Sequence, residues 1–393
     1  MKLPLEGVRI LAVEQFGAAP YGTMLLANLG AEVIKIENAT AGGDPSRSVG
    51  PTFLGEGDSL YFQSWNLGKK SVLLDLKSDG GRLALETLAR DAHALANNLR
   101  GDQPAKLGLD YASLAKANPA IVCLHISAYG RDNERAGRPG YDFLMQAEAG
   151  LMSLTGDPAG PSSRFGTSII DCMTGVIGAL GLLAAIWNAR ETGKGCDVDT
   201  CLFDVALAQL NYAATWYLND GLVSSRQPRG AHLALTPVQT FPTRDGWVFV
   251  MCMTERFWQV LVNELGRAEL ANDARFKDQA ERLRNRAALT EILDEEFRKQ
   301  PTAHWQAKLE SVLPIGPVYD LAQALDNPFV KATGMVQDIA HPARKSIKVL
   351  APPIKLDGKR PVQRAASPAG ADSEALLGAA LAAAAAAAKQ ETT

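Results

Sequence analysis

One carboxylate stands at the head of a long apolar stretch, "SIIDCMTGVIGALGLLAAIWNAR", which covers residues 168–190. After Asp171 come sixteen uncharged residues, Cys172 to Trp187. The stretch could be a membrane span, a buried helix, or a helix whose start carries chemistry. Sixteen residues fall short of the ~20 that a bilayer requires. Glycines repeat every three residues and suit tight packing, so a buried helix of a globular protein is expected.

The place of Asp171 before a helix predicts an ionised side chain. Unpaired backbone N–H groups and the positive end of the helix dipole stabilise an anion at this position. The pKa of the carboxyl group is therefore expected to be low. An ionised carboxylate can act as a covalent nucleophile, but an aspartate here is also an ordinary N-cap. The spacing by itself leaves both interpretations open.

Composition sets the broad class of the protein. The chain has 393 residues, of which 47% are hydrophobic and 21% charged, with a net charge of −3. This length suits two domains or one large one, and the charge indicates neither a nucleic-acid nor a membrane partner. The five cysteines form no C-x-x-C pair, and the five histidines are scattered. These features predict reduced thiols, a cytoplasmic location, and no metal site.

Strand and helix patterns alternate along the first half of the chain. "VRILAVE", "YGTMLLANLG" and "AEVIKIE" predict a strand, a helix and a second strand within about thirty residues. This is a βαβ unit, and the pattern repeats, so we expect an α/β fold with a parallel sheet. Ligands of such sheets gather at the carboxyl ends of the strands. Those ends are residues 14–17, 37–38, 97–99 and 127–130.

The second half of the chain predicts a change of architecture. "VQTFPTRDGWVFVMCM" predicts two strands joined by an Arg-Asp-Gly turn, and amphipathic helices fill about residues 255–312. We therefore expect a large domain over residues 1–221 and a smaller α+β domain over residues 222–320. Residues 321–393 are expected to return to the large domain and to end in an Ala-rich tail.

The first βαβ unit also raises the possibility of a nucleotide enzyme. Glu37 ends the second predicted strand twenty residues after Gly17, where an acid could bind a ribose. However, "FGAAPYG" is not the G-x-G-x-x-G phosphate fingerprint, and the chain contains neither a G-x-S-x-G nor a G-K-[ST] motif. An NAD- or FAD-dependent oxidoreductase stays an alternative, as does a solvent-exposed Glu37 without a role.

Four stretches resemble the family III CoA-transferases, also called the CaiB/BaiF family, which include formyl-CoA:oxalate and crotonobetainyl-CoA:carnitine CoA-transferases. The resemblance runs from about residue 5 to 353. It is carried by "LEGVRILAVEQFGAAPYGTMLLANLGAEVIKIE", "NLGKKSVLLDLKSDGGR", "ANNLRGDQPAKLGLDYASL" and "DCMTGVIGALGLLAAIWNARETGKGCDVD". In this family the aspartate that opens the last stretch is the covalent nucleophile. The resemblance therefore implies that Asp171 is the catalytic residue.

The resemblance also implies the sites for coenzyme A and for the acyl group. The CoA-binding residues that it implies are Phe16, Gly17, Ala18, Leu74, Lys77, Asn98, Leu99, Lys106 and Leu107. The substrate pocket is expected to contain Gln15, Tyr141 and Asp142. Lys77 and Lys106 would suit the phosphate groups of CoA, although each could also be ordinary surface charge.

Departures from the family pattern bear on the substrate. Formate-transferring members carry Gln where Gly17 stands and Arg where Asn38 stands, and residues 224–236 lack their glycine-rich loop. Formyl-CoA:oxalate specificity is therefore not expected. Gly17 is expected to leave room for a bulkier acyl group. A dicarboxylate such as succinate is the acceptor that we expect, with a second carboxylate held by Arg164, Arg226 or Arg229.

A racemase branch is similar in sequence and has a His where Tyr141 stands. Racemisation needs two bases, and tyrosine, with a pKa of about 10, is a poor base at neutral pH. The residues therefore favour a transferase, with a 2-methylacyl-CoA racemase or a non-catalytic CoA-binding protein as alternatives. The resemblance further implies a Rossmann-like large domain, an interlocked ring-like homodimer, and acyl-CoA and carboxylic acid as the only ligands.

Overall fold

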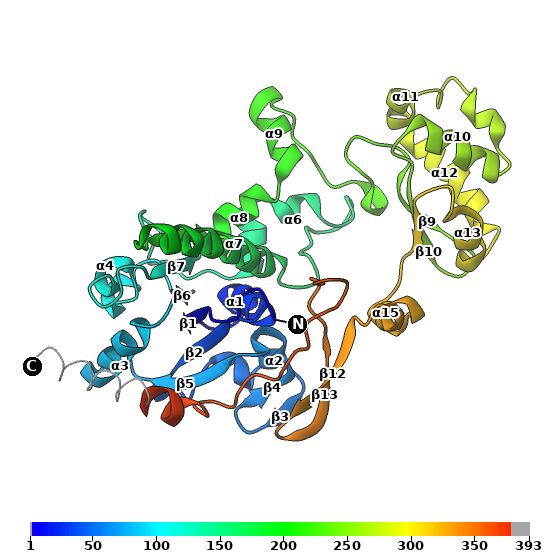
Figure 1. The fold of residues 1–393 in the computed structure, drawn as a ribbon. Helices are drawn as coiled ribbons and strands as arrows, with labels where there is room; N and C mark the ends of the chain where they lie inside the picture. The colour runs from blue at the N-terminus through cyan, green and yellow to red at the C-terminus, as the bar shows by residue number, and fades with distance from the viewer. Residues whose placement is uncertain (1, 379–393) are drawn as a thin grey trace, which may run out of the picture. The chain divides into compact units, whose positions relative to one another are not determined.

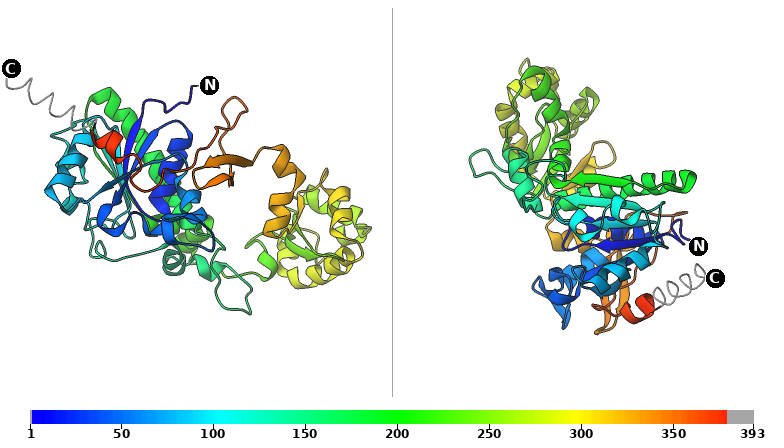
Figure 2. Two further views of the ribbon diagram at one scale, coloured as in Figure 1. Left: turned by 90° about the horizontal axis from the view of Figure 1, so that it is seen from below. Right: turned by 90° about the vertical axis from the view of Figure 1, so that its left-hand side faces the viewer.

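The computed structural model describes residues 2–378, which divide into two compact units. Residues 2–149, 166–209 and 328–378 form the large unit, and Gly150–Phe165 with Leu210–Asn327 form the small unit. This division assigns residues 150–165 and 210–221 to the small unit, whereas the sequence placed them in the large domain. Figures 1 and 2 show the ribbon of both units from three sides.

A six-stranded sheet forms the centre of the large unit (Figure 1), with the order β5-β2-β1-β6-β7-β8. Each neighbouring pair of strands is parallel, as the alternating pattern predicted. The strands are β1 (Arg9–Val13), β2 (Glu32–Asn38), β5 (Lys70–Leu74), β6 (Ala94–Asn97), β7 (Val122–Ser127) and β8 (Asp197–Cys201). The strand order reverses between β1 and β6. Ligands of open α/β sheets bind at such a switch point.

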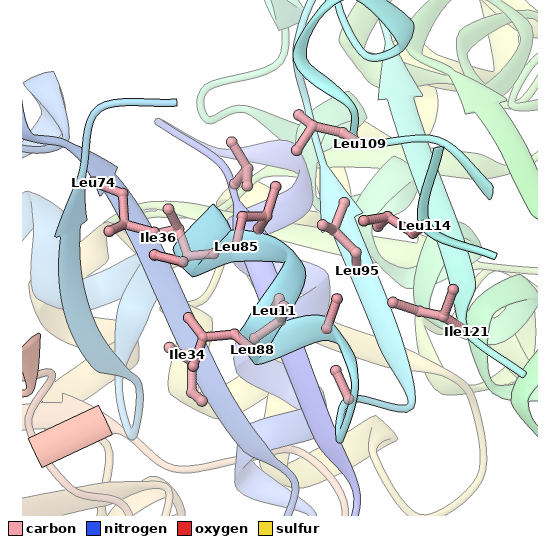
Figure 3. Close-up of a cluster of buried hydrophobic side chains, with 14 of the residues drawn as sticks. Leu11, Ile34, Ile36, Leu74, Leu85, Leu88, Leu95, Leu109, Leu114 and Ile121 are labelled. Carbon is pink, nitrogen blue, oxygen red and sulfur yellow. The ribbon is translucent and has the colours of Figure 1, made fainter. Parts of the chain in front are cut away.

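One face of the sheet carries a continuous apolar core. Helices α3 (Asp79–Ala89) and α4 (Tyr111–Leu114) cover this face. Figure 3 shows Leu85 and Leu88 of α3 lying over Leu11 of β1 and Ile34 of β2. All four side chains are buried, so the hydrophobic effect fixes α3 across the strands that end at the switch point.

The other face is covered by α1 (Ala18–Asn28) and α7 (Ile169–Thr192), whose backbones touch. A Cβ on Gly22 would lie 2.4 Å from the carbonyl oxygen of Gly175. A Cβ on Gly175 would lie 2.5 Å from the carbonyl oxygen of Ala18. Only glycine permits this approach, which brings the start of α1 against the first turns of α7.

The prediction of a buried helix is only partly right for α7. Its inner face packs on α1 and β7, where Gly178 meets Ile126 and Leu124. On its outer face, the side chains of Leu180 and Trp187 are 68% and 70% exposed. By length and composition alone α7 is long and apolar enough to cross a membrane, and 39% of its most apolar window is buried against the rest of the chain. Helix α7 is thus apolar on both faces, and the single chain buries one of them.

Several shorter elements complete the large unit. They are β3 (Phe53–Gly55), β4 (Asp58–Ser59), α2 (Leu60–Asn66), α5 (Asp142–Glu148), α8 (Leu202–Ala208), α15 (Pro328–Ala332), β12 (Val336–His341) and β13 (Arg344–Leu350). The last two form an antiparallel hairpin. After it, the chain runs beside β5, where the amide of Asp372 donates to the carbonyl of Ser71 at 3.0 Å. This segment covers the edge strand of the sheet. The Ala-rich tail after residue 378 lies outside the described residues.

The small unit has a core of its own. Its antiparallel sheet, β11-β10-β9, contains the hairpin that the sequence predicted around Arg244–Gly246. The strands are β9 (Val238–Pro242), β10 (Trp247–Met251) and β11 (Ile315–Pro317), and the helices are α6 (Leu151–Leu154), α9 (Asn211–Asp220), α10 (Glu255–Glu264), α11 (Gln279–Arg284), α12 (Arg286–Arg298), α13 (Thr302–Leu309) and α14 (Leu321–Asp326). Trp258 and Phe297 lie at the centre of the core.

Candidate active site

Two adjacent cavities open at the carboxyl ends of the strands of the large unit, and both include Gln15 and Leu99. The first, called here the strand-end cavity, is lined by Val13, Glu14, Gln15, Ile36, Glu37, Asn38, Thr40, Gly43, Asp44, Pro45, Leu74, Asp75, Leu76, Lys77, Leu99 and Leu107. The second, the Asp171 cavity, is lined by Gln15, Phe16, Gly17, Ala18, Asn98, Leu99, Arg100, Gln103, Ile126, Ser127, Ala128, Arg138, Pro139, Gly140, Tyr141, Asp171 and Leu202.

Asp171 lies in the first turn of α7 and faces the loop that follows β1. A Cβ on Gly17 would lie 2.4 Å from Oδ2 of Asp171, so only glycine leaves room for the carboxylate. From the sequence, we expected Gly17 to leave room for a bulkier acyl group. The structure shows that the space is taken by Asp171 itself.

The expectation of a low pKa for Asp171 is wrong. Burial, followed by the negative charge of Asp142, raises the pKa of Asp171 to about 7. Oδ2 of Asp142 also accepts a hydrogen bond from the backbone amide of Asp171 at 2.9 Å. The N–H group that could have stabilised the Asp171 side chain thus serves a second carboxylate instead.

The loop between β1 and α1 has an unusual backbone. Phe16 has a φ of 58°, in the left-handed region that side chains other than glycine rarely adopt. Its ring meets the ring of Tyr141 edge to face, with 6.1 Å between centroids. The side chain of Tyr141 is 64% exposed, while Asp142 beside it is buried and accepts from Gln146 at 2.5 Å. Gln15, Tyr141 and Asp171 thus line one cavity, and Asp142 lies behind it.

The residues that the resemblance implied for CoA fall into three groups. Leu74, Lys77 and Leu107 line the strand-end cavity, with Leu99 shared between both cavities. Phe16, Gly17, Ala18 and Asn98 line the Asp171 cavity. The side chain of Asn98 bonds the backbone of Gln15 twice, accepting at 2.9 Å and donating at 2.6 Å. Lys106 lines neither cavity, and its ammonium group lies 2.8 Å from Oδ2 of Asp102.

Glu37 is not free to bind a ribose. Arg47 contacts both carboxylate oxygens, at 2.6 and 2.8 Å, and Ser71 donates to one of them at 2.6 Å. Burial acts to raise the pKa of Glu37, but the hydrogen bonds and charge of Arg47 outweigh it and lower the pKa. With both oxygens occupied, this residue gives no support to a dinucleotide site.

Sequence reasoning missed three polar side chains of the Asp171 cavity, namely Arg100, Gln103 and Arg138. Arg100 and Gln103 lie in the loop after β6, between the positions implied for CoA, so their place in the chain was a usable signal. The arginines expected for a second carboxylate belong to the small unit. There Arg226 donates to the carbonyl of Gly160 at 2.8 Å, and Arg229 pairs with Asp294. Arg164 donates to the carbonyl of Phe165 at 2.9 Å.

The chain is similar to known proteins over most of its length. The sequence pattern of CoA-transferase family III matches residues 5–373. The acetyl-CoA:oxalate CoA-transferase of Acetobacter aceti is 34% identical over 361 residues, covering 91% of this chain and 90% of that protein. The succinyl-CoA:glutarate CoA-transferase of Mus musculus is 33% identical, covering 90% and 80% respectively.

A solved structure shows the same fold over nearly the whole chain. The crystal structure of a CAIB/BAIF family protein from Brucella suis superposes with a TM-score of 0.83 and 31% identity, covering 97% of this chain and 100% of that one. The fold, the family match and the relatives all indicate the same protein family. The chain belongs to CoA-transferase family III.

Proposed function

We propose that this enzyme moves coenzyme A from an acyl-CoA to a dicarboxylic acid, with Asp171 as the covalent nucleophile. The observation that carries the proposal is the half-buried carboxylate of Asp171, packed on Gly17 in a cavity at the switch point of the sheet. A pKa of about 7 keeps a substantial fraction of Asp171 ionised at neutral pH, and burial leaves that anion poorly hydrated and therefore reactive.

The reaction needs no net proton transfer. A carboxylate oxygen of Asp171 attacks the thioester carbonyl carbon, the C–S bond breaks, and CoA leaves as a thiolate from the mixed anhydride. The thiolate then attacks the carbonyl carbon of Asp171, which releases the donor acid and leaves an aspartyl-CoA thioester. The acceptor carboxylate attacks the carbonyl carbon of this thioester, the C–S bond breaks, and CoA leaves again as a thiolate from a second anhydride. CoA thiolate finally attacks the acceptor acyl carbon and frees Asp171.

Each attack places negative charge on a carbonyl oxygen. Gly17 and Ala18 open α1, and the first amides of a helix have no carbonyl partner within it. These amides lie beside Asp171 and are suited to stabilise the oxyanion. The Phe16 amide is less suited, because it already points at Oδ1 of Asp44, 3.5 Å away.

Coenzyme A fits across both cavities. The strand-end cavity offers leucine side chains to the adenine, and Lys77 at its rim to a phosphate group. The shared residues Gln15 and Leu99 lead from there to Asp171, along the path that the pantetheine arm would take. Lys106 is left out of this proposal because it lines neither cavity.

Two arginines favour a dicarboxylate. Arg100 and Arg138 line the Asp171 cavity, and a guanidinium group binds a carboxylate through two parallel hydrogen bonds. The names of the relatives point the same way, since they include oxalate, glutarate, mesaconate and malate. We therefore assign the second carboxylate of the acid to Arg100 and Arg138, in place of the three arginines of the small unit.

Location and assembly complete the proposal. Five free cysteines in the described residues fit a reducing cytoplasm, and the exposed apolar face of α7 fits an interface between two copies of the chain. A racemase is the alternative. It is disfavoured because Tyr141, which stands where the racemase branch has a His, carries an exposed phenol that is a poor base.

The test compares Asp171→Ala with Asp79→Ala, which changes an exposed acid in the first turn of α3. Both variants should fold, and only Asp171→Ala should lose transfer from acyl-CoA to a panel of mono- and dicarboxylic acids. Hydroxylamine added after the donor should label the Asp171 peptide of the wild-type enzyme. Retained turnover in Asp171→Ala would refute the nucleophile, and α-deuteration of a 2-methylacyl-CoA in deuterated water would indicate the racemase.

A further inference from the structure

Six buried charged residues lie beside the Glu14–Gly17 loop, which touches Asp171. The cluster contains three carboxylates and three cations, and each residue is at most 5% exposed. Its members are Glu14, Lys35, Glu37, Asp44, Arg47 and Lys69. Burying ions is costly unless each is paired, so a cluster of this size beside a reaction site calls for a role.

Within the cluster, Lys35 contacts the loop itself. Its ammonium group donates to the backbone carbonyl of Glu14 at 2.8 Å and lies 2.9 Å from Oδ2 of Asp44. The other oxygen of Asp44, Oδ1, lies 3.5 Å from the amide of Phe16 and accepts from Ser46 at 2.9 Å. Lys35 therefore holds the loop at two points, once directly and once through Asp44.

The loop needs such support. Phe16 occupies the left-handed region, which a non-glycine residue keeps only where its surroundings impose it. Asn98 fixes Gln15 between the two points held by Lys35. Immediately after this strained residue, Gly17 packs on the carboxylate of Asp171. A relaxed Phe16 would move Gly17 and the two amides at the start of α1.

We propose that Lys35 is a positioning residue: it fixes the Glu14–Gly17 loop in its strained conformation, so that Gly17 and the following amide meet Asp171 in the reacting geometry. This inference rests on the proposed role of Asp171. Lys35 touches neither Asp171 nor the cavity that contains it, and its contribution is to the geometry of the reaction step, not to the binding of CoA.

The other buried lysine of the cluster marks the difference. Lys69 bonds the carboxylate of Glu14 at 2.6 Å and the carbonyl of Pro20 at 2.8 Å, and thus holds a side chain and α1 instead of the loop backbone. Burial, partly offset by Glu14, lowers the pKa of Lys69 to about 8. Lys35 is the cation that meets both the Glu14 carbonyl and the acid beside Phe16.

The experiment uses Lys35→Met combined with Asp44→Asn. The pair removes one positive and one negative charge, so no buried ion is left without a partner. The new amide side chain at position 44 keeps an oxygen for the amides of Phe16 and Ser46. Because Asp44 also lines the strand-end cavity, Asp44→Asn alone is the reference for CoA binding, and we expect the folded double variant to have a KM for acyl-CoA within about twofold of that reference. We expect kcat to fall by about 100-fold, since a misplacement of about 1 Å can cost this much.

Lys70→Met is the matched control. Lys70 lies on β5 next to the cluster and pairs with Glu32 at the surface, without contact to the loop. Its kcat should equal that of wild type. Lys35→Arg is the second variant in case the double variant does not fold. It keeps a buried cation, but its larger, planar group displaces the Glu14 carbonyl, so kcat should again fall with KM preserved.

The outcomes separate this inference from the proposed function. Wild-type kcat in either folded Lys35 variant would overturn the positioning role, as would a raised KM with unchanged kcat. Slower labelling of Asp171 by hydroxylamine in those variants would support it. An active Asp171→Ala enzyme would instead refute the nucleophile, whatever the Lys35 variants do.

Discussion

A buried carboxylate that must be ionised to react weakens the fold that carries it. Asp171, the half-buried residue that we propose as the nucleophile, is in this position, because burial and the neighbouring Asp142 both disfavour its charge. The carboxyl group keeps its proton in the folded state up to about pH 7, whereas an unfolded aspartate loses it near pH 3.8. Reactivity and stability are therefore opposed at this residue.

The pH dependence of rate and stability tests this opposition. We expect log(kcat/KM) to rise with a slope of one against pH until the pH reaches about 7 and then to level off, because only ionised Asp171 would attack the thioester. Between about pH 4 and pH 7 the folded state binds more protons than the unfolded state, so stability falls as the pH rises.

Asp171→Asn, which stays neutral, should remove that loss of stability. Its gain over wild type should be near zero at about pH 4 and reach up to about 4 kcal/mol at about pH 8, from a pKa difference of about three units. Thermal denaturation at both pH values measures it. An Asn variant that is no more stable than wild type at the higher pH would mean that Asp171 is ionised at no cost.

Part of the residue-scale picture could be predicted from sequence. The apolar run and the family motif singled out Asp171, whose role as the nucleophile stays a prediction, but its pKa was predicted in the wrong direction. The helix-terminus argument is local, whereas the burial comes from Gly17, far earlier in the chain, and the charge from Asp142. The positioning role that we propose for Lys35 was not predicted, because the pattern "AEVIKIE" does not indicate that this lysine will donate to the carbonyl of Glu14.

At the scale of elements, the contact of α1 with α7 determines where Asp171 meets the loop. The sequence predicted both helices and noted the glycines, yet it indicated no partner for them. Pairing Gly22 with Gly175 depends on the parallel sheet that carries both helices on one face. Periodicity predicts strands and helices well because it is local, and it is silent about which helix faces which.

Gly175→Ala tests this contact, with Gly80→Ala as its control. The new methyl at residue 175 would lie 2.5 Å from the carbonyl oxygen of Ala18, so the helices must separate. We expect a loss of about 1–3 kcal/mol in the free energy of unfolding, the usual cost of overpacking, together with a lower kcat as Gly17 moves from Asp171.

Gly80 lies in the first turn of α3, where its added methyl would meet open space. Alanine there should be neutral or stabilising by up to about 1 kcal/mol. Urea denaturation of both variants gives the comparison. Equal stability of the two would mean that α1 and α7 do not need backbone contact.

At the scale of the whole molecule, the prediction of a second, α+β unit rested on a strand hairpin and on amphipathic helices read from the sequence, and a C-terminal return was expected after them. The small unit keeps its own core around Trp258, and the returning chain bonds β5. The exact limits were harder to predict, because residues 150–165 join the small unit although they are distant from its other residues in sequence.

The exposed apolar face of α7 carries the last prediction, a homodimer. Leu180 and Trp187 on this helix are 68% and 70% exposed, and Val176 is 41% exposed. Large apolar side chains gathered on one surface are typical of a protein interface, and the resemblance to the family implies interlocked subunits.

We expect sedimentation to give twice the chain mass of 42.0 kDa at nanomolar concentration, with no monomer on dilution. Interlocked subunits separate only when they unfold, so the denaturation midpoint should rise with protein concentration. Trp187→Asp should destabilise the dimer, whereas Lys2→Asp, at the exposed N-terminus, should not. A folded, active monomer at any concentration would exclude the interlocked assembly.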